Sequence, residues 1–126
     1  MITSASIGYK SERGKVAYVE CRFDGYLSHV GRLLVEHYND LDKMVRLLCG
    51  GDIVSLREDL EDTIFENPKD YGRPNEHQAK VAKSVGDYLL YGNGDYKYLF
   101  DGDKWYVVDG QFEEDGISWV LWPLDA

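Results

Sequence analysis

Residue types that could do chemistry gather where one predicted strand ends and the first predicted helix begins. Arg22 could bind an anion, Asp24 could accept a proton or cap the helix, and Tyr26 could stack on a ligand or donate a hydrogen bond. His37 lies further along the same predicted helix. These four residues form a candidate crevice for a small molecule or a nucleotide. The alternative interpretation is structural, with Asp24 as the helix cap and Gly25 as the turn.

The spacing of histidine and cysteine predicts no metal site. His29 and His37 are eight residues apart on one predicted helix, which is more than two turns and too far for two ligands of one ion. His37 also falls on the apolar side of that helix, so we expect it in the core. Asp101–Lys104 are similar to the carboxylate and lysine arrangement of metal-dependent nucleases, but the same residues suit a hairpin turn.

Other chemical motifs are missing from the sequence. It contains no glycine-rich phosphate loop, no nucleophile elbow and no paired Cys/His spacing. Cys21 and Cys49 are expected to be reduced and buried as small hydrophobic residues. We therefore predict no metal, no cofactor and no catalytic set, which makes an enzyme the less favoured interpretation.

Charge is the strongest signal in the composition. The net charge is −9, from 23 acids and 14 bases. A protein that binds nucleic acid must neutralise phosphates with Lys and Arg, and an anionic membrane surface also attracts basic proteins, so we expect neither partner. The excess lies in two segments, residues 52–70 with net −5 and residues 95–126 with net −6. The acids expected to bind a partner are Glu58, Asp59, Glu61, Asp62, Glu113, Glu114 and Asp115.

Segregated acidity has two interpretations. It could form a contact surface for a basic groove of another protein, because such carboxylates meet the same Lys and Arg side chains that phosphates meet. It could equally keep the protein soluble.

The elements that position these residues follow from hydrophobic periodicity. Alternation predicts a hairpin of strands over residues 2–9 and 15–23, with Ala17, Val19, Cys21 and Phe23 facing the core. Three- and four-residue steps predict helices over 27–38, 41–48 and 76–91, the second capped by Asp40. Gly31 within the first helix is expected to pack closely against a strand. Strands are predicted over 96–100, 105–108 and 117–122, with turns at Asp101–Asp103 and Asp109–Gly110.

The segment 52–74 gives the weakest signal. Leu56, Leu60, Ile64 and Phe65 could form a short helical turn, followed by a surface loop around two prolines. The order ββ-ααα-βββ predicts an α+β fold, an antiparallel sheet of about four to five strands with two or three helices on one face. The 126 residues suit a single domain over 1–126. The sequence shows no signal peptide and no apolar run of membrane-spanning length, so we expect a cytoplasmic protein.

The segment Cys21–Leu27 (Cys-Arg-Phe-Asp-Gly-Tyr-Leu) resembles the motif Cys-His-Trp-Asp-Gly-Tyr-Pro of small phage and prophage proteins of unassigned function. Arg22, Phe23 and Leu27 stand where that pattern has His, Trp and Pro, so any chemistry of the family's His is lost here. The resemblance is weak between residues 57 and 92, and it implies a phage-derived accessory gene without a settled activity. It continues through Thr3–Gly8, Val30-Gly31, Leu34, His37-Tyr38, Gly51–Ile53, Ser55-Leu56, Tyr96–Phe100 and Lys104–Val107.

The sequence therefore favours a non-enzymatic phage accessory protein in the host cytoplasm. It would bind and inhibit a host protein with a basic groove, such as a component of a CRISPR defence complex, through its acidic surface. The alternative is a protein that binds a small ligand or nucleotide, or acts on it, at Arg22, Asp24 and Tyr26. A homo-oligomeric structural part is a third interpretation.

Overall fold

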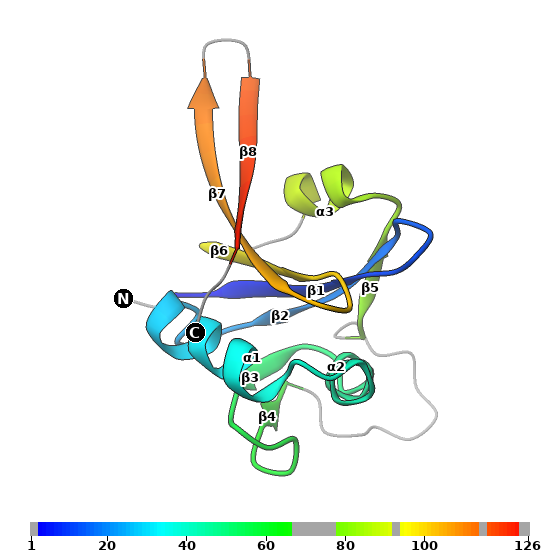
Figure 1. Cartoon of the computed structure of the whole chain (residues 1–126). Helices are drawn as coiled ribbons and strands as arrows, with labels where there is room; N and C mark the ends of the chain where they lie inside the picture. The colour runs from blue at the N-terminus through cyan, green and yellow to red at the C-terminus, as the bar shows by residue number, and fades with distance from the viewer. Residues whose placement is uncertain (1–2, 67–77, 92–93, 114–115, 124–126) are drawn as a thin grey trace.

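A computed structural model of the protein describes residues 3–66, 78–91, 94–113 and 116–123 (Figure 1). For Tyr91 and for residues 108–123 it describes the backbone only. The fold is α+β, as predicted, with helices packed on a mixed sheet. The strands are β1 (Ala5–Lys10), β2 (Val16–Cys21), β3 (Ile53–Ser55), β4 (Ile64–Phe65), β5 (Lys80–Ala82), β6 (Tyr96–Phe100), β7 (Trp105–Glu113) and β8 (Gly116–Pro123).

The prediction of a purely antiparallel sheet was wrong. The strand order is β4-β3-β2-β1-β6-β7-β8, with β5 also paired to β2. The predicted hairpin β1–β2 is antiparallel, but β1 pairs with β6 in parallel, and so does β2 with β3. Between β2 and β3 the chain crosses one face of the sheet through its helices, so it returns to the sheet running in the same direction. Short-range sequence patterns do not reveal such a crossover.

The first two predicted helices are present. A π-helical turn η1 (Leu27–Gly31) continues directly into α1 (Arg32–His37), and α2 (Leu41–Cys49) follows. The Asp40 side chain accepts a hydrogen bond from the Asp42 amide at 3.0 Å, which confirms the predicted cap. Only Met44, Leu47 and Leu48 of α2 are buried, whereas Leu41 and Val45 are more than two-fifths exposed.

The third helix is shorter than predicted. Helix α3 (Val85–Tyr91) begins nine residues later than expected, and Lys80–Ala82 forms strand β5, which pairs with Val16–Tyr18 of β2. The signal that marks the true start is Ser84, whose Oγ accepts a hydrogen bond from the Asp87 amide at 3.1 Å. This is the Ser-x-x-acid pattern of a helix N-terminus. The start of the predicted helix, residues 76 and 77, lies outside the described residues.

The segment after α2 is extended rather than helical. Ile53 is fully buried on β3, and Ile64 on β4 pairs with Ser55, so the predicted helical turn was wrong. The β-branched run Ile53-Val54 favours a strand, and the left-handed backbone of Gly51 (φ 82°) precedes it. Pro68 and Pro74, the two prolines expected in the following loop, lie outside the described residues.

The C-terminal hairpins differ in length from the prediction. The turn between β6 and β7 is confirmed, with Asp101 Oδ1 accepting hydrogen bonds from the amides of Asp103 at 2.8 Å and Lys104 at 2.7 Å. The turn predicted at Asp109–Gly110 was wrong, because β7 continues through it to Glu113. Hairpin β7–β8 projects away from the rest of the fold (Figure 1).

The sheet is covered on both faces, so the prediction of helices on one face was also wrong. Helices α1 and α2 lie on one side and α3 on the other (Figure 1). On β2, Val19 and Cys21 belong to the main core, whereas Val16 and Tyr18 belong to a second cluster beneath α3. Phe23, predicted to face the core, is 37% exposed. A central strand that is buried on both faces carries hydrophobic residues on both. Its sequence therefore lacks the alternation of hydrophobic and polar residues that marks a half-buried strand.

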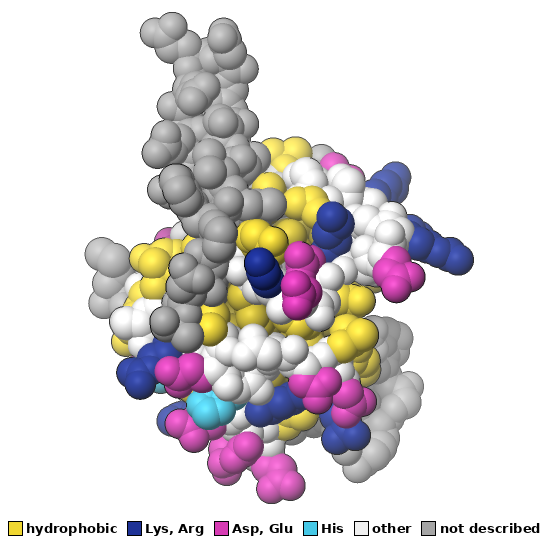
Figure 2. Space-filling model, in the orientation of Figure 1, with side chains coloured by type: hydrophobic (Ala, Val, Ile, Leu, Met, Phe, Trp, Pro, Cys, Tyr) yellow, Lys and Arg dark blue, Asp and Glu magenta, His cyan; other side chains and the backbone are white. Residues whose placement is uncertain are grey.

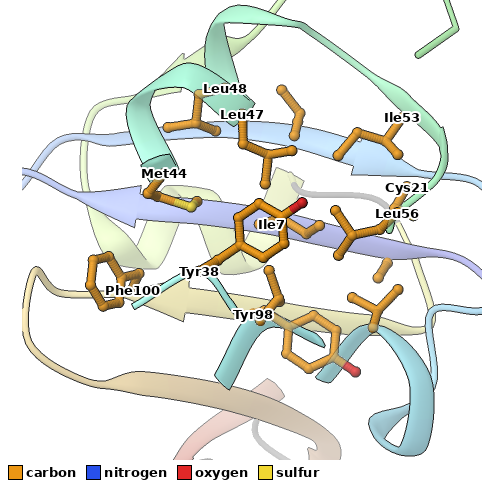
Figure 3. Packing of buried hydrophobic residues seen from close by; sticks show 14 of the residues in the cluster. Ile7, Cys21, Tyr38, Met44, Leu47, Leu48, Ile53, Leu56, Tyr98 and Phe100 are labelled. Atoms are coloured by element: carbon orange, nitrogen blue, oxygen red, sulfur yellow. The ribbon is translucent and has the colours of Figure 1, made fainter. Parts of the chain in front are cut away.

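The main core joins the sheet to η1, α1 and α2 (Figure 3). Polar atoms of its aromatic residues are satisfied: the Trp105 indole donates to the Tyr38 carbonyl at 3.1 Å, and the Tyr98 hydroxyl donates to the Gly25 carbonyl at 2.7 Å. A Cβ at Gly31 would lie 3.3 Å from the ring of Tyr98 on β6, so the close packing predicted there is confirmed. This core fixes the strand-to-helix segment that carries the candidate crevice.

Candidate functional site

The structure brings Asp24 and Tyr26 together. The Tyr26 hydroxyl donates a hydrogen bond to Asp24 Oδ1 at 3.3 Å, and the charge of Asp24 raises the pKa of the Tyr26 phenol. The backbone at Asp24 is left-handed (φ 58°), a conformation that Asp tolerates better than most residues. Asp24 is thus the turn residue, and the helix that follows has Tyr26 at its N-cap without a side-chain hydrogen bond. The alternative role of Asp24 as helix cap was therefore wrong.

Arg22 faces a different environment. Its Nε lies 2.8 Å from Glu66 Oε1, beside a hollow of about 180 Å³. The acidic residues Glu20 and Asp52 also line this hollow. Three acids around one paired guanidinium repel a phosphate, so the hollow is a poor site for a nucleotide.

His37 is separate from both groups. Its Nε2 lies 3.8 Å from Glu36 Oε2 and 3.8 Å from Glu58 Oε1, and its side chain is about one-third exposed. The expectation of a core histidine was wrong, because the end of α1 turns His37 towards acidic side chains instead of the sheet. The four residues of the candidate crevice therefore form three separate groups of contacts: Asp24 with Tyr26, Arg22 with Glu66, and His37 with Glu36 and Glu58.

The acids Glu58, Asp59, Glu61 and Asp62 are all exposed, on the turn between β3 and β4. The turn is held in place from inside: Thr63 Oγ1 donates to the Asp59 carbonyl at 3.0 Å and accepts from the Arg57 amide at 3.1 Å. Two further bonds anchor the start of the turn, from the Tyr38 hydroxyl to the Arg57 carbonyl at 2.6 Å and from Lys43 Nζ to the Glu58 carbonyl at 2.9 Å. Four hydrogen bonds thus fix the backbone on which these carboxylates stand.

Further acids adjoin the turn, although sequence analysis did not assign them to a site. Asp40 and Asp42, at the start of α2, line an open hollow of about 560 Å³ together with Asp59 and Glu61. Figure 2 shows acidic side chains gathered along the lower edge of the molecule, over α1, α2 and the β3–β4 turn, with basic side chains among them. We call this set the acidic surface; it consists of Glu36, Asp40, Asp42, Glu58, Asp59, Glu61 and Asp62.

The acids of this surface differ in their pairing. Asp42 forms an ion pair with Arg46 at 3.3 Å, and Glu36 forms one with Arg32 at 3.0 Å. No ion pair joins the carboxylates of Asp59, Glu61 or Asp62 to another described residue. These three carboxylates, which stand on a fixed turn, are therefore available to an external cation.

An apolar hollow borders the acidic surface. It encloses about 480 Å³, and Leu33, Leu56 and Ile64 provide its apolar lining. Glu58 and Asp62 stand beside them, together with Arg57 and His29. Ile64 is 50% exposed, so the hollow offers apolar area next to the carboxylates of the turn.

The acids of the second predicted segment, Glu113, Glu114 and Asp115, have no described side chains. The backbone of Glu113 ends β7, and its side chain lies outside the description, as do Glu114 and Asp115. Their part in a contact surface stays a prediction.

Across the described residues, no group of three or more His, Cys, Asp or Glu side chains is arranged to hold a metal ion. The helices within those residues are all too short or too polar to cross a membrane. Comparison of the chain with family models, with curated proteins and with solved structures gave no significant match.

Proposed function

We propose that the chain is a non-enzymatic binding protein whose acidic surface docks against a basic groove of a partner protein. The observation that carries this proposal is the set of three exposed carboxylates, Asp59, Glu61 and Asp62, which form no ion pair with described residues. Acids that serve solubility alone need no fixed backbone. Here the turn that carries them is held by four hydrogen bonds to its backbone and to Thr63.

A fixed turn supports binding because less conformational entropy is lost when the partner arrives. The carboxylates would steer a basic partner during encounter, and the hollow at Leu33, Leu56 and Ile64 would supply the apolar contact that contributes most of the affinity.

The resemblance to small phage and prophage proteins extends this proposal to a host target. A protein whose groove normally holds nucleic acid presents rows of Lys and Arg, and carboxylates can occupy them in place of phosphates. We therefore infer that the protein acts as a phage accessory inhibitor in the bacterial cytoplasm, with a nucleic-acid-binding defence complex, such as a CRISPR complex, as its target class.

The test compares two variants that remove equal charge. E61Q/D62N neutralises two acids of the turn, and E12Q/D103N neutralises two exposed acids in other turns. In affinity capture from a bacterial lysate, E61Q/D62N should recover roughly tenfold less partner, because two interfacial acids that contribute about 0.7 kcal/mol each together account for about 1.4 kcal/mol. E12Q/D103N should behave like the wild type.

The second part of this test measures how partner recovery depends on salt concentration. Raising the salt concentration from about 0.1 M to about 1 M shortens the screening length from roughly 10 Å to roughly 3 Å, so recovery by the wild type should fall steeply. Equal recovery by the two double variants, or recovery that salt does not change, would contradict the proposal.

The alternative of a nucleotide site at Arg22, Asp24 and Tyr26 receives less support from the geometry, because Arg22 pairs with Glu66 and acids line its hollow. A thermal-shift panel of nucleotides separates the two proposals. A ligand at 100 times its Kd would add about 2.7 kcal/mol to the free energy of unfolding.

A further inference from the structure

Strand β8 has an open edge. It lies at the end of the strand order, and its neighbour in the sheet is β7. Backbone N–H and C=O groups of an antiparallel strand alternate between its two edges. Half of the β8 backbone groups therefore face an edge along which no described strand lies. The β7–β8 hairpin projects away from the rest of the fold (Figure 1).

The sequence of β8 lacks the features that usually protect such an edge. Exposed edge strands are commonly short, carry Lys or another charge, or contain an internal proline. Strand β8 has eight residues and no charged residue, and Pro123 is its last position. Most of its other residues have strong β propensity, namely Ile117, Trp119, Val120 and Trp122. Both its length and its composition favour pairing with a further strand.

We propose that β8 pairs antiparallel with β8 of a second copy of this chain, across a twofold axis. Two identical strands in this arrangement cover both open edges at once, so the assembly closes at a dimer. The absence of charge on β8 matters here, because it lets two copies with net charge −9 meet without like charges at the contact. A basic partner would find no carboxylate on this strand. The proposal is independent of the acidic surface.

The size of the contact predicts how strong the dimer is. Eight residues at about 3.3 Å each span about 26 Å, and a sheet is about 10 Å thick, so the edge offers on the order of 260 Å² per copy. A standard stable interface uses roughly 800 Å² per partner. We therefore expect a reversible, concentration-dependent dimer instead of an obligate one.

The test uses Ser118 on β8 and its cross-strand partner Gln111 on β7. S118K and S118E add a charge to the open edge strand, whereas Q111K adds one at the same position along the hairpin on β7, one strand further from the proposed contact. Sedimentation equilibrium over concentrations on the order of 1 μM to 1 mM should show the wild type and Q111K rising from 14.5 kDa towards twice that mass. S118K and S118E should each stay near 14.5 kDa, because the twofold axis falls near the middle of β8, where the long side chains of the two copies of residue 118 lie within reach of each other.

An equimolar mixture of S118K and S118E should form the dimer again, since opposite charges then face each other. A merely unfolded hairpin could not be rescued by mixing. A wild type that stays at 14.5 kDa throughout, a mass that grows beyond the dimer, a mixture that stays monomeric, or equal loss in Q111K would each overturn the proposal.

Discussion

The two cysteines show how strongly local surroundings decide the chemistry of one residue type. Cys21 lies fully buried on β2, and burial raises the pKa of its thiol from 9.0 to about 11. Cys49, at the end of α2, is exposed. The expectation that both thiols are buried was therefore wrong for Cys49, because Cys49 lies on the side of α2 away from Met44, Leu47 and Leu48.

This contrast predicts stepwise reactivity towards a disulfide reagent such as Ellman's reagent at neutral pH. One thiol per chain should react quickly, and the second should react only after denaturation, because the buried thiol is both shielded and protonated. C49S should have no fast thiol. Two fast thiols in the native wild type would contradict the burial of Cys21.

The same shift has a consequence for stability. The folded chain keeps the Cys21 proton that the unfolded chain loses above about pH 9. This contribution to the free energy of unfolding is therefore complete below pH 9 and is lost as the pH rises to about 11.

Among the elements, α2 is the one whose start is best defined by a single side chain. Its N-cap Asp40 accepts from the Asp42 amide, and α2 carries both Met44 and Leu47 into the core. D40A should lower the free energy of unfolding by about 1 kcal/mol, whereas D40N should change it by a few tenths, because Asn is an equally good cap. Denaturant titration measures both. A D40N loss equal to that of D40A would mean that the charge of Asp40 matters more than its cap.

Elements with local signals could be predicted from sequence. The β1–β2 hairpin, the cap at Asp40 and the turn at Asp101 depend on residues close together in the chain. The pairing of β1 with β6 joins positions about 90 residues apart and leaves no local trace. Strand β5 was missed because three residues beside β2 give too short a pattern.

In the candidate site, too, some features have local sequence signals and others depend on long-range packing. Exposure of Glu58–Asp62 could be predicted from a dense run of acids, and the structure confirms it for the four acids of this turn. Their proximity to Asp40 and Asp42 depends on how α2 packs, and His37 could not be assigned correctly for the same reason.

For the whole molecule, like charges on one fixed surface imply a cost. Glu58, Asp59, Glu61 and Asp62 repel one another in the folded state, and burial of the core must offset that repulsion. Proteins commonly retain such destabilising features where binding needs them.

We therefore expect binding and stability to move in opposite directions. E61Q/D62N should keep the free energy of unfolding or raise it by up to about 0.5 kcal/mol, although it loses partner recovery. Chemical denaturation of this variant beside E12Q/D103N measures the change. A loss above about 1 kcal/mol would show that these acids stabilise the fold, and the functional interpretation would fail.

The position of β6 in the sheet also constrains how the protein folds during its synthesis. Strand β1 leaves the ribosome well before its neighbour β6, which is made some 90 residues later. Until then, the inner edge of β1 and the apolar side chains of the β1–β2 hairpin have no final cover. A nascent chain stalled before Tyr96 should thus stay open to proteases, and protection should arise abruptly once Trp105 has emerged.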